Sequence, residues 1–461
     1  MLFRLPIALR KWYTWPQWLA SFDVFLISFM VGFQNGWASP ILAKLRSANS
    51  TLPITDSEAS WIASLLNAGR AFGSIGGLFC AEYFGSKTSL VQNAFIHGIG
   101  MACLLYVTSV NWLYASRFIV GFGSGMWQTI FPIYVGEISN PKIRGALVSF
   151  ITLGMPIGYM IGNIVGAHTT MWASGCFGIA IIAMFLLLFF WFPHSPYHLA
   201  MHDQIDKALA SITWYQRDAD AVIELVSIKE YVEEKRWLKL TDYFNEMLRD
   251  VNRIALFKVT MIHLLLQFAG FCTLGYYMEI ILTTAQINFM NPADVVSAIA
   301  GGGLIGGLIS IYTCDKCGRK VSMGGGALGF AFGLIGVGIY FHLIYLGIPV
   351  AETFQWVPVL MIIILEFAIN IGIDPVVGTI FSEMFAPSIK ITASSLINFF
   401  SSVFAFISTQ WYQSLVDAVE IHYAFYFFST SAALLAVFSF LFLPETKGKS
   451  LQEIQKMLRN K

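Results

Sequence analysis

Residues 137–144 read EISNPKIR, and residues 383–390 read EMFAPSIK. Both octapeptides share a glutamate, a proline four residues later, and an isoleucine followed by a basic residue. Each stands between two long apolar stretches, and the second begins 246 residues after the first. The repetition predicts that the chain consists of two related halves, an organisation typical of membrane transporters.

The amino-acid composition indicates that lipid covers much of the surface. Of the 461 residues, 56% are hydrophobic and 12% are charged, whereas about 25% of the residues are charged in a typical globular protein. The formal net charge is only +1, so the chain lacks the large basic footprint of a nucleic-acid-binding protein. We expect the lipid bilayer as a partner and no nucleic acid.

Membrane-crossing segments account for most of the chain. A transmembrane helix needs about 20 mostly apolar residues, and this criterion selects 18–42, 59–82, 88–108, 111–136, 145–167, 171–193, 256–284, 296–314, 321–346, 356–383, 391–416 and 421–443. Six of these stretches precede one long polar segment and six follow it. The sequence therefore predicts an all-α membrane protein with twelve transmembrane helices in two six-helix bundles.

The predicted spans divide the chain into five parts. These are a cytosolic N-terminus (1–17), a first bundle (18–193), a cytosolic helical linker (194–255), a second bundle (256–443) and a cytosolic tail (444–461). Apolar residues at helical spacing within the linker predict short amphipathic helices. The linker is either a solvated connection or a latch that touches the helix ends in one transport state.

Small residues predict how some of the helices pack. Gly69 and Gly73 are spaced by four residues, as are Gly121 and Gly125. This spacing places small residues on one helix face, so the backbones of neighbouring helices can approach closely.

Basic residues predict the orientation of the chain through the positive-inside rule. With both termini in the cytosol, only Lys44 and Arg46 of the 28 lysines and arginines fall in outer loops. Asn49 begins the sequence Asn-Ser-Thr in the first outer loop and is the expected glycosylation site. We expect a multi-pass protein of the plasma membrane that is a monomer.

The reactive side chains do not suggest catalysis. Cys314 and Cys317 have the C-x-x-C spacing, but no second ligand pair accompanies them, so we expect ordinary reduced thiols rather than a metal or redox centre. Four of the eight histidines are scattered singly over apolar stretches, namely His97, His168, His263 and His342, and we expect them to be structural. No nucleophile and base stand together. We expect neither an enzyme nor a bound cofactor or metal.

Longer motifs resemble those of one transporter family. The segment from Pro132 to Arg144, the sequence Pro193-His194-Ser195-Pro196 and the sequence 444–451 (PETKGKSL) resemble the signatures after helices four, six and twelve of the sugar porter family of the major facilitator superfamily. The resemblance covers essentially the whole chain, and that family contains facilitative glucose transporters and insect trehalose transporters. It implies a carrier that moves a sugar by alternating access.

Charged residues at the cytosolic helix ends form the expected inner gate. These residues are Glu137, Arg144, Asp315, Arg319, Glu383 and Lys390. An exposed pair of opposite charges contributes only about 0 to 1 kcal/mol, but several pairs together act as a network. We expect these charges to pair across the two halves when the inner side is closed. The alternative is that they only anchor helix ends.

The expected substrate site keeps little of the family's sugar-binding pattern. Gln267 is retained on the seventh helix, whereas Gly378 stands where the family has a tryptophan, which predicts a wider cavity. Sugars are held by hydrogen bonds and an aromatic face. The polar and aromatic residues expected near mid-depth are Gln34, Asn35, Trp127, Gln128, Thr152, Gln267, Asn370, Asp374 and Ser401.

The mode of transport stays open at this stage. The resemblance aligns Gln34 with an aspartate that proton-coupled relatives carry beside the counterpart of Arg117, which favours passive transport. Asp374 is either a proton or cation carrier, or a structural residue that pairs with Arg70 or caps a broken helix. The alternatives are a facilitative carrier of a mono- or disaccharide such as glucose or trehalose, a proton- or ion-coupled carrier, and a sugar sensor that does not transport.

Overall fold

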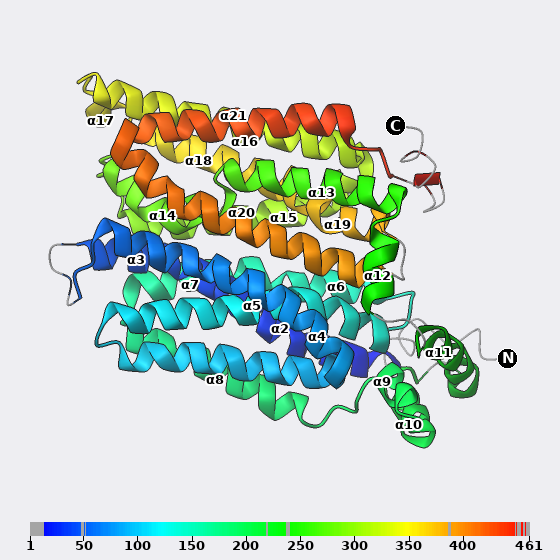
Figure 1. The fold of residues 1–461 in the computed structure, drawn as a ribbon. Coiled ribbons are helices and arrows are strands. Elements are labelled where there is room, and N and C mark those ends of the chain that lie inside the picture. Colours follow the sequence, from blue (N-terminus) through cyan, green and yellow to red (C-terminus); the bar gives the residue numbers. More distant parts are fainter. Residues whose placement is uncertain are drawn as a thin grey trace.

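Long helices that run side by side make up the protein. The computed structural model describes residues 13–47, 50, 52–217, 220–236, 240–385, 389–447, 449, 453–454 and 457, and every regular element in them is helical. Figure 1 shows the shorter helices α9 to α12 gathered at one end of the long ones. We call this the linker end and the opposite one the far end.

The helices fall into three groups along the chain. The first half contains α2 (Trp15–Gly36), α3 (Ala38–Arg46), α4 (Asp56–Cys103), η1 (Leu104–Tyr106), α5 (Val110–Ile138), α6 (Arg144–Thr152), α7 (Gly154–His168) and α8 (Met171–Phe189). The linker contains α9 (Pro196–Met201), α10 (Ile205–Tyr215), α11 (Ala221–Arg236) and α12 (Leu240–Met247). The second half contains α13 (Asp250–Phe268), α14 (Phe271–Thr284), α15 (Pro292–Cys317), α16 (Arg319–Tyr345), α17 (Val350–Thr353), α18 (Trp356–Ala368), the π-helix η2 (Ile369–Ile373), α19 (Asp374–Met384), α20 (Lys390–Val419) and α21 (Ile421–Phe442).

Eleven helical segments in the described part of the chain are long and apolar enough to cross a membrane. One of them, Asp56–Tyr106, is 51 residues long and would exceed twice the thickness of the bilayer core at about 1.5 Å per residue. It changes direction at Gly85, where φ is 77°, a backbone conformation that glycine adopts readily. This segment therefore contains two spans, and the twelve predicted helices are confirmed.

Glycines bring α4 and α5 into backbone contact. A Cβ atom added at Gly73 would lie 1.9 Å from the carbonyl oxygen of Phe122, and one added at Gly121 would lie 2.1 Å from that of Leu66. Any side chain at either position would therefore force the two helices apart. The close packing predicted from the spacing of these glycines is confirmed.

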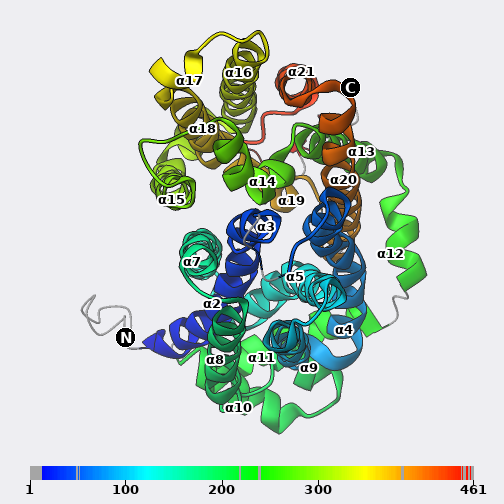
Figure 2. The same cartoon turned by 90° about the vertical axis from the view of Figure 1, so that its left-hand side faces the viewer.

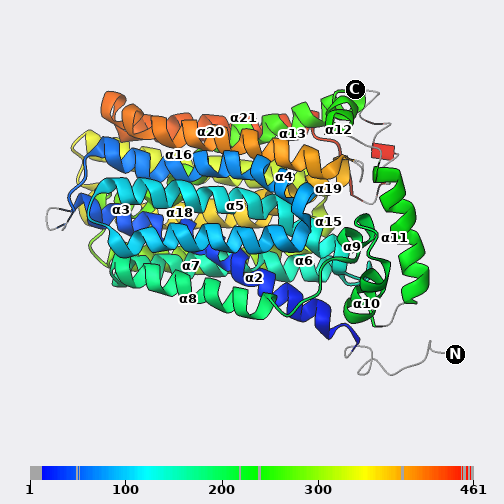
Figure 3. The same ribbon diagram turned by 60° about the horizontal axis from the view of Figure 1, so that its bottom comes forward.

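The linker packs against the first half. The hydroxyl of Tyr215 on α10 lies 3.1 Å from that of Tyr134 on α5 and donates to the carbonyl oxygen of Pro193 at 2.9 Å. The amide of Gln17 donates to the Tyr215 carbonyl oxygen at 3.0 Å. Figure 3 shows α9, α10 and α11 next to the ends of the long helices. These contacts make the linker more than a solvated connection in this conformation.

The two halves lie side by side. Figure 2 shows α2 to α8 on one side and α13 to α21 on the other. Helices of the two halves contact one another, namely α4 and α5 with α20, α2 and α3 with α14, and α7 with α15. The expected glycosylation site Asn49 lies outside the described residues, as does the side chain of Asp315.

Candidate functional site

Polar side chains join the halves towards the far end. The hydroxyl of Ser60, one turn into α4, donates to the carbonyl oxygen of Gln410 on α20 at 3.1 Å, and that of Ser64 donates to the Gln410 side chain at 2.7 Å. The hydroxyl of Ser39 on α3 accepts the backbone N–H of Glu279 on α14 at 2.9 Å. Because all these residues lie in the far-end parts of their helices, the halves are held together on that side.

A second set of contacts lies deeper, where the seventh span is interrupted. Gly270 has a φ of 86° and separates α13 from α14. The Tyr276 hydroxyl on α14 shares its proton between the side-chain oxygens of Asn67, at 3.2 Å, and Asn35, at 3.3 Å. Arg70 donates to the same Asn35 oxygen at 3.0 Å. We call Asn35, Asn67, Arg70 and Tyr276 the Tyr276 cluster.

The substitution Tyr276→Phe tests whether this cluster holds the far end closed. It removes the shared hydroxyl, so the Asn67 oxygen loses its donor and the Asn35 oxygen keeps only Arg70. This loss costs about 1 kcal/mol and shifts the balance of conformations roughly fivefold towards an open far end. Spin labels at the exposed residues Ser57 and Ser414 should then report a larger population with a long distance between the halves.

The matched control for this variant is Tyr340→Phe. The Tyr340 hydroxyl donates to the carbonyl oxygen of Ala285 at 3.0 Å, and both residues belong to the second half. This control should leave the distance distribution unchanged. An equal shift in both variants would mean that the Tyr276 hydroxyl has no special role between the halves.

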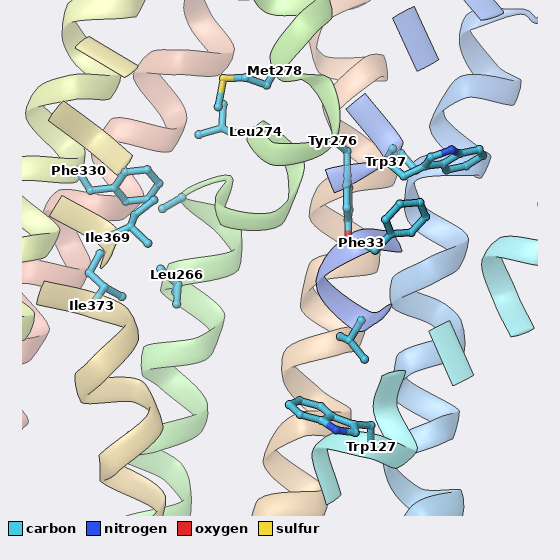
Figure 4. Close-up of a cluster of buried hydrophobic side chains, with 14 of the residues drawn as sticks. Phe33, Trp37, Trp127, Leu266, Leu274, Tyr276, Met278, Phe330, Ile369 and Ile373 are labelled. Carbon is cyan, nitrogen blue, oxygen red and sulfur yellow. The ribbon is translucent and has the colours of Figure 1, made fainter. Parts of the chain in front are cut away.

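Three members of the Tyr276 cluster were not expected as site residues. Asn67 and Tyr276 are 209 residues apart in the chain, so only the folded structure brings them together. Two features of the sequence could have pointed to this cluster. One is an arginine within an apolar span, and the other is a tyrosine shortly after a glycine that interrupts a helix. Tyr276 also belongs to a buried cluster with Phe33 and Trp37, drawn in Figure 4.

Gln34 lies inside the first half in this conformation. Its side-chain amide nitrogen contacts the sulfur of Met101, and its backbone carbonyl oxygen accepts a hydrogen bond from Arg117 at 2.9 Å. The Arg117 guanidinium lies over the Trp37 ring, 5.3 Å from the ring centroid. The neighbouring Asn35, by contrast, faces the second half.

The other expected site residues of the first half are Trp127, Gln128 and Thr152, and each has different surroundings. Trp127 is 1% exposed and stacks on Phe131 with ring centroids 4.3 Å apart, so its ring has no free face for a sugar here. Gln128 is half-buried. The exposed Thr152 donates to the carbonyl oxygen of Ser149 in its own helix at 3.0 Å.

The structure brings expected residues of the second half together in pairs. The Ser401 hydroxyl on α20 lies 3.2 Å from the amide nitrogen of Gln267 and 2.9 Å from Nδ1 of His263. The Asn370 amide in the π-helix donates to the carbonyl oxygen of Glu366 at 2.8 Å and to its carboxylate at 3.2 Å. His263 and Glu366 were not expected as site residues.

Asp374 begins α19 directly after the π-helix, and its side chain is exposed. It lies close to Cys272 and to Glu366. The hydrogen bond that the structure gives for Arg70 goes to Asn35 rather than to Asp374. One turn further along α19, a Cβ atom added at Gly378 would meet nothing within 4 Å, so there is open space at this position.

Charged residues of the second half form a network at the linker end. Arg319 pairs with Glu383 at 2.8 Å, and Glu383 also accepts a hydrogen bond from Thr446. Glu445 accepts the backbone N–H groups of Arg319 at 3.0 Å and Lys320 at 3.1 Å. Partial burial acts against the charge of Glu445, but these N–H groups and that of Lys447 hold its pKa below the ordinary value.

The corresponding residues of the first half have different partners. Glu137 accepts a hydrogen bond from Ser86, and Arg144 donates to the carbonyl oxygen of Gly136 at 3.2 Å. Arg144 also lies close enough to Lys390 of the second half for the two charges to interact. Because both residues are cationic, the repulsion between them favours separation of the halves at the linker end.

Comparisons with known proteins agree with this architecture. The family described as "Sugar (and other) transporter" matches residues 17–458. The facilitated trehalose transporter Tret1 of Bombyx mori is 28% identical over 459 residues, which cover 97% of this chain and 88% of that protein. Tret1 of Apis mellifera ligustica is 25% identical over 95% of this chain and 88% of its own.

Solved structures show the same fold. The inward-open conformation of the xylose transporter XylE from E. coli matches with a TM-score of 0.77 and 21% identity, over 95% of this chain and 98% of that chain. A second structure is that of the major facilitator superfamily proton:xylose symporter XylE bound to 6-bromo-6-deoxy-D-glucose. It matches with a TM-score of 0.76 and 20% identity, over 97% of this chain and all of that chain. With its twelve membrane helices and a family match over nearly its whole length, the chain belongs to the sugar transporter family.

Proposed function

We propose that the protein is a facilitative carrier that moves a sugar across the plasma membrane by alternating access. The observation that carries this proposal is the uneven closure of the molecule. Several hydrogen bonds join the halves at the far end. Nearer the linker end Ser395 donates to the carbonyl oxygen of Ser74 at 2.8 Å, but the charges of Arg144 and Lys390 repel each other there. A carrier that opens to one compartment at a time needs such a conformation.

The proposed orientation places the linker end and both termini in the cytosol. The distribution of lysine and arginine supports it, because only Lys44 and Arg46 fall in outer loops under this orientation. The structure then corresponds to the inward-facing state. The same orientation places Asn49 outside, where it is available for glycosylation.

The proposed solute is a mono- or disaccharide such as glucose or trehalose. Paired amide and hydroxyl groups, such as Gln267 with Ser401, offer the donors and acceptors that sugar hydroxyls require. The open space at Gly378 leaves room for a larger solute, and the trehalose transporters among the relatives support this class. Asn35, Asn370 and the remaining expected residues stay candidates for contacts with the sugar.

Passive transport is the preferred mode. Beside Arg117 stands Gln34, whose amide does not ionise in the physiological range. A proton- or ion-coupled carrier is the second candidate, because the carboxylates of Asp374 and Glu366 lie close together in mid-span.

Purified protein in liposomes tests the proposal. Labelled glucose and trehalose should enter down their gradients and exchange with unlabelled sugar, while a pH-sensitive dye inside the vesicles stays constant. Sugar-dependent acidification of the vesicle lumen would instead support the coupled carrier. The absence of any flux with protein that still binds sugar would favour a sensor.

A further inference from the structure

Arg70 places a cation at the interface between the two halves. Besides its hydrogen bond to Asn35, it lies close to the Cys272 thiol and to Tyr276, both on α14 of the second half. Its Nε atom is buried and has no hydrogen-bond partner. The side chain thus holds a donor that the protein itself does not use in this conformation.

A second arginine increases the positive charge at the same depth. Arg117 lies close enough to Arg70 for the two charges to interact, and its Nε and Nη2 atoms are also buried without partners. Among the residues that the structure describes, no ion pair within 4.0 Å involves either guanidinium. Two cations without a counter-ion are costly inside a membrane protein, and such residues usually serve substrates or ions.

An oxyanion is the ligand that best completes this arrangement. A guanidinium presents parallel N–H groups that match a carboxylate or phosphate, and such charge-assisted bonds are stronger than bonds to neutral hydroxyls. A neutral sugar could accept hydrogen bonds from Arg70 but would leave its charge uncompensated. We propose that the pathway carries an anionic sugar and that Arg70 binds its carboxylate or phosphate group.

The acids of the second half favour one orientation of such a solute. Asp374 and Glu366 lie on the opposite side of the interface from Arg70 and would repel an oxyanion. The charged group would therefore face the first half, and the ring hydroxyls would face Gln267 and Ser401, which already form a hydrogen-bonded pair. This inference rests on the proposed function, because it specifies the solute of that carrier.

Uptake of three sugars by liposomes containing the full chain tests the inference. The probes are labelled glucuronate, glucose 6-phosphate and glucose, and the first two distinguish a carboxylate from a phosphate. We expect at least one anionic sugar to be carried about tenfold more efficiently than glucose. In Arg70→Gln this preference should fall at least about tenfold, the loss expected for one charged hydrogen-bonded contact, while glucose uptake falls by a smaller factor.

Two further variants make the test specific. Arg70→Lys keeps the charge without the planar fork and should retain part of the preference. Arg253→Gln removes a charge from an exposed side chain that pairs with Asp250. This variant should leave the uptake rates of all three sugars unchanged.

The outcomes separate this inference from the proposed function. If glucose is carried but neither anionic sugar is carried or competes, the inference is wrong and the carrier function stands. An equal loss for all three sugars in Arg70→Gln would also overturn it, because Arg70 would then have only a structural role. If no sugar is carried at all, the proposed function itself fails.

Discussion

The substitution Gly73→Val should reduce the yield of correctly folded protein at least tenfold. A Cβ atom at this position would lie 1.9 Å from the carbonyl oxygen of Phe122 and 2.8 Å from its Cα atom. Both atoms belong to the backbone of α5, so no rotation of a side chain can relieve the clash. Overpacking of a core costs about 1 to 3 kcal/mol, occasionally more, and this is a large part of the stability of a typical protein.

Detergent extracts that are run on a size-exclusion column measure this effect. The monodisperse peak should nearly vanish for Gly73→Val and fall partly for Gly73→Ala. Gly325→Val is the matched control, because a Cβ atom added there meets nothing within 4 Å, so its peak should stay close to that of the parent protein. Similar profiles for the Gly73 and Gly325 valine variants would show that α4 and α5 can separate without loss of the fold.

The substitution Glu383→Gln should lower the initial rate of sugar uptake about tenfold or more. The amide keeps the shape of the carboxylate but removes its charge from a pair in which Arg319 is 13% and Glu383 is 21% exposed. Hydrogen bonds to charged groups are worth about 1.5 to 3 kcal/mol. We expect the linker-end network to rearrange each time the carrier changes state. The loss of the Glu383 charge should therefore slow that change of state.

Uptake rates divided by the amount of protein at the cell surface measure this prediction. Surface expression should stay normal, because the pair stabilises the linker end and not the helix core. Glu230→Gln is the control, since Glu230 is an exposed glutamate of the linker, and Arg144→Ala should slow uptake in the same direction as Glu383→Gln. Unchanged rates in both Glu383→Gln and Arg144→Ala would remove these residues from the inner gate.

The sequence predicts the spans well because a membrane imposes length and polarity on every helix. It gives the depth of a residue but not the direction of its side chain. Gln34 and Asn35 are neighbours at the same depth, yet Gln34 contacts Met101 inside the first half and Asn35 contacts Tyr276 of the second half. This direction depends on how helices rotate against one another, which spacing alone does not reveal.

The charged network shows a second reason why part of the site could not be predicted. The residues at the linker end were expected from their types and positions, but their partners depend on the conformation. In this one Arg319 pairs with Glu383 within the second half, and pairing across the halves stays a prediction for the opposite state. A single sequence encodes both states, so it does not specify which contacts exist together.

The π-helix between α18 and α19 has a mechanical consequence for that opposite state. Its wider turn weakens the regular hydrogen-bond ladder and provides a natural hinge. Beyond the hinge, the 11 residues of α19 form a lever arm of about 16 Å at about 1.5 Å per residue. A swing of about 20° at Ile369–Ile373 would displace Glu383 by roughly 5 to 6 Å on this arm, more than enough to exchange one ionic partner for another.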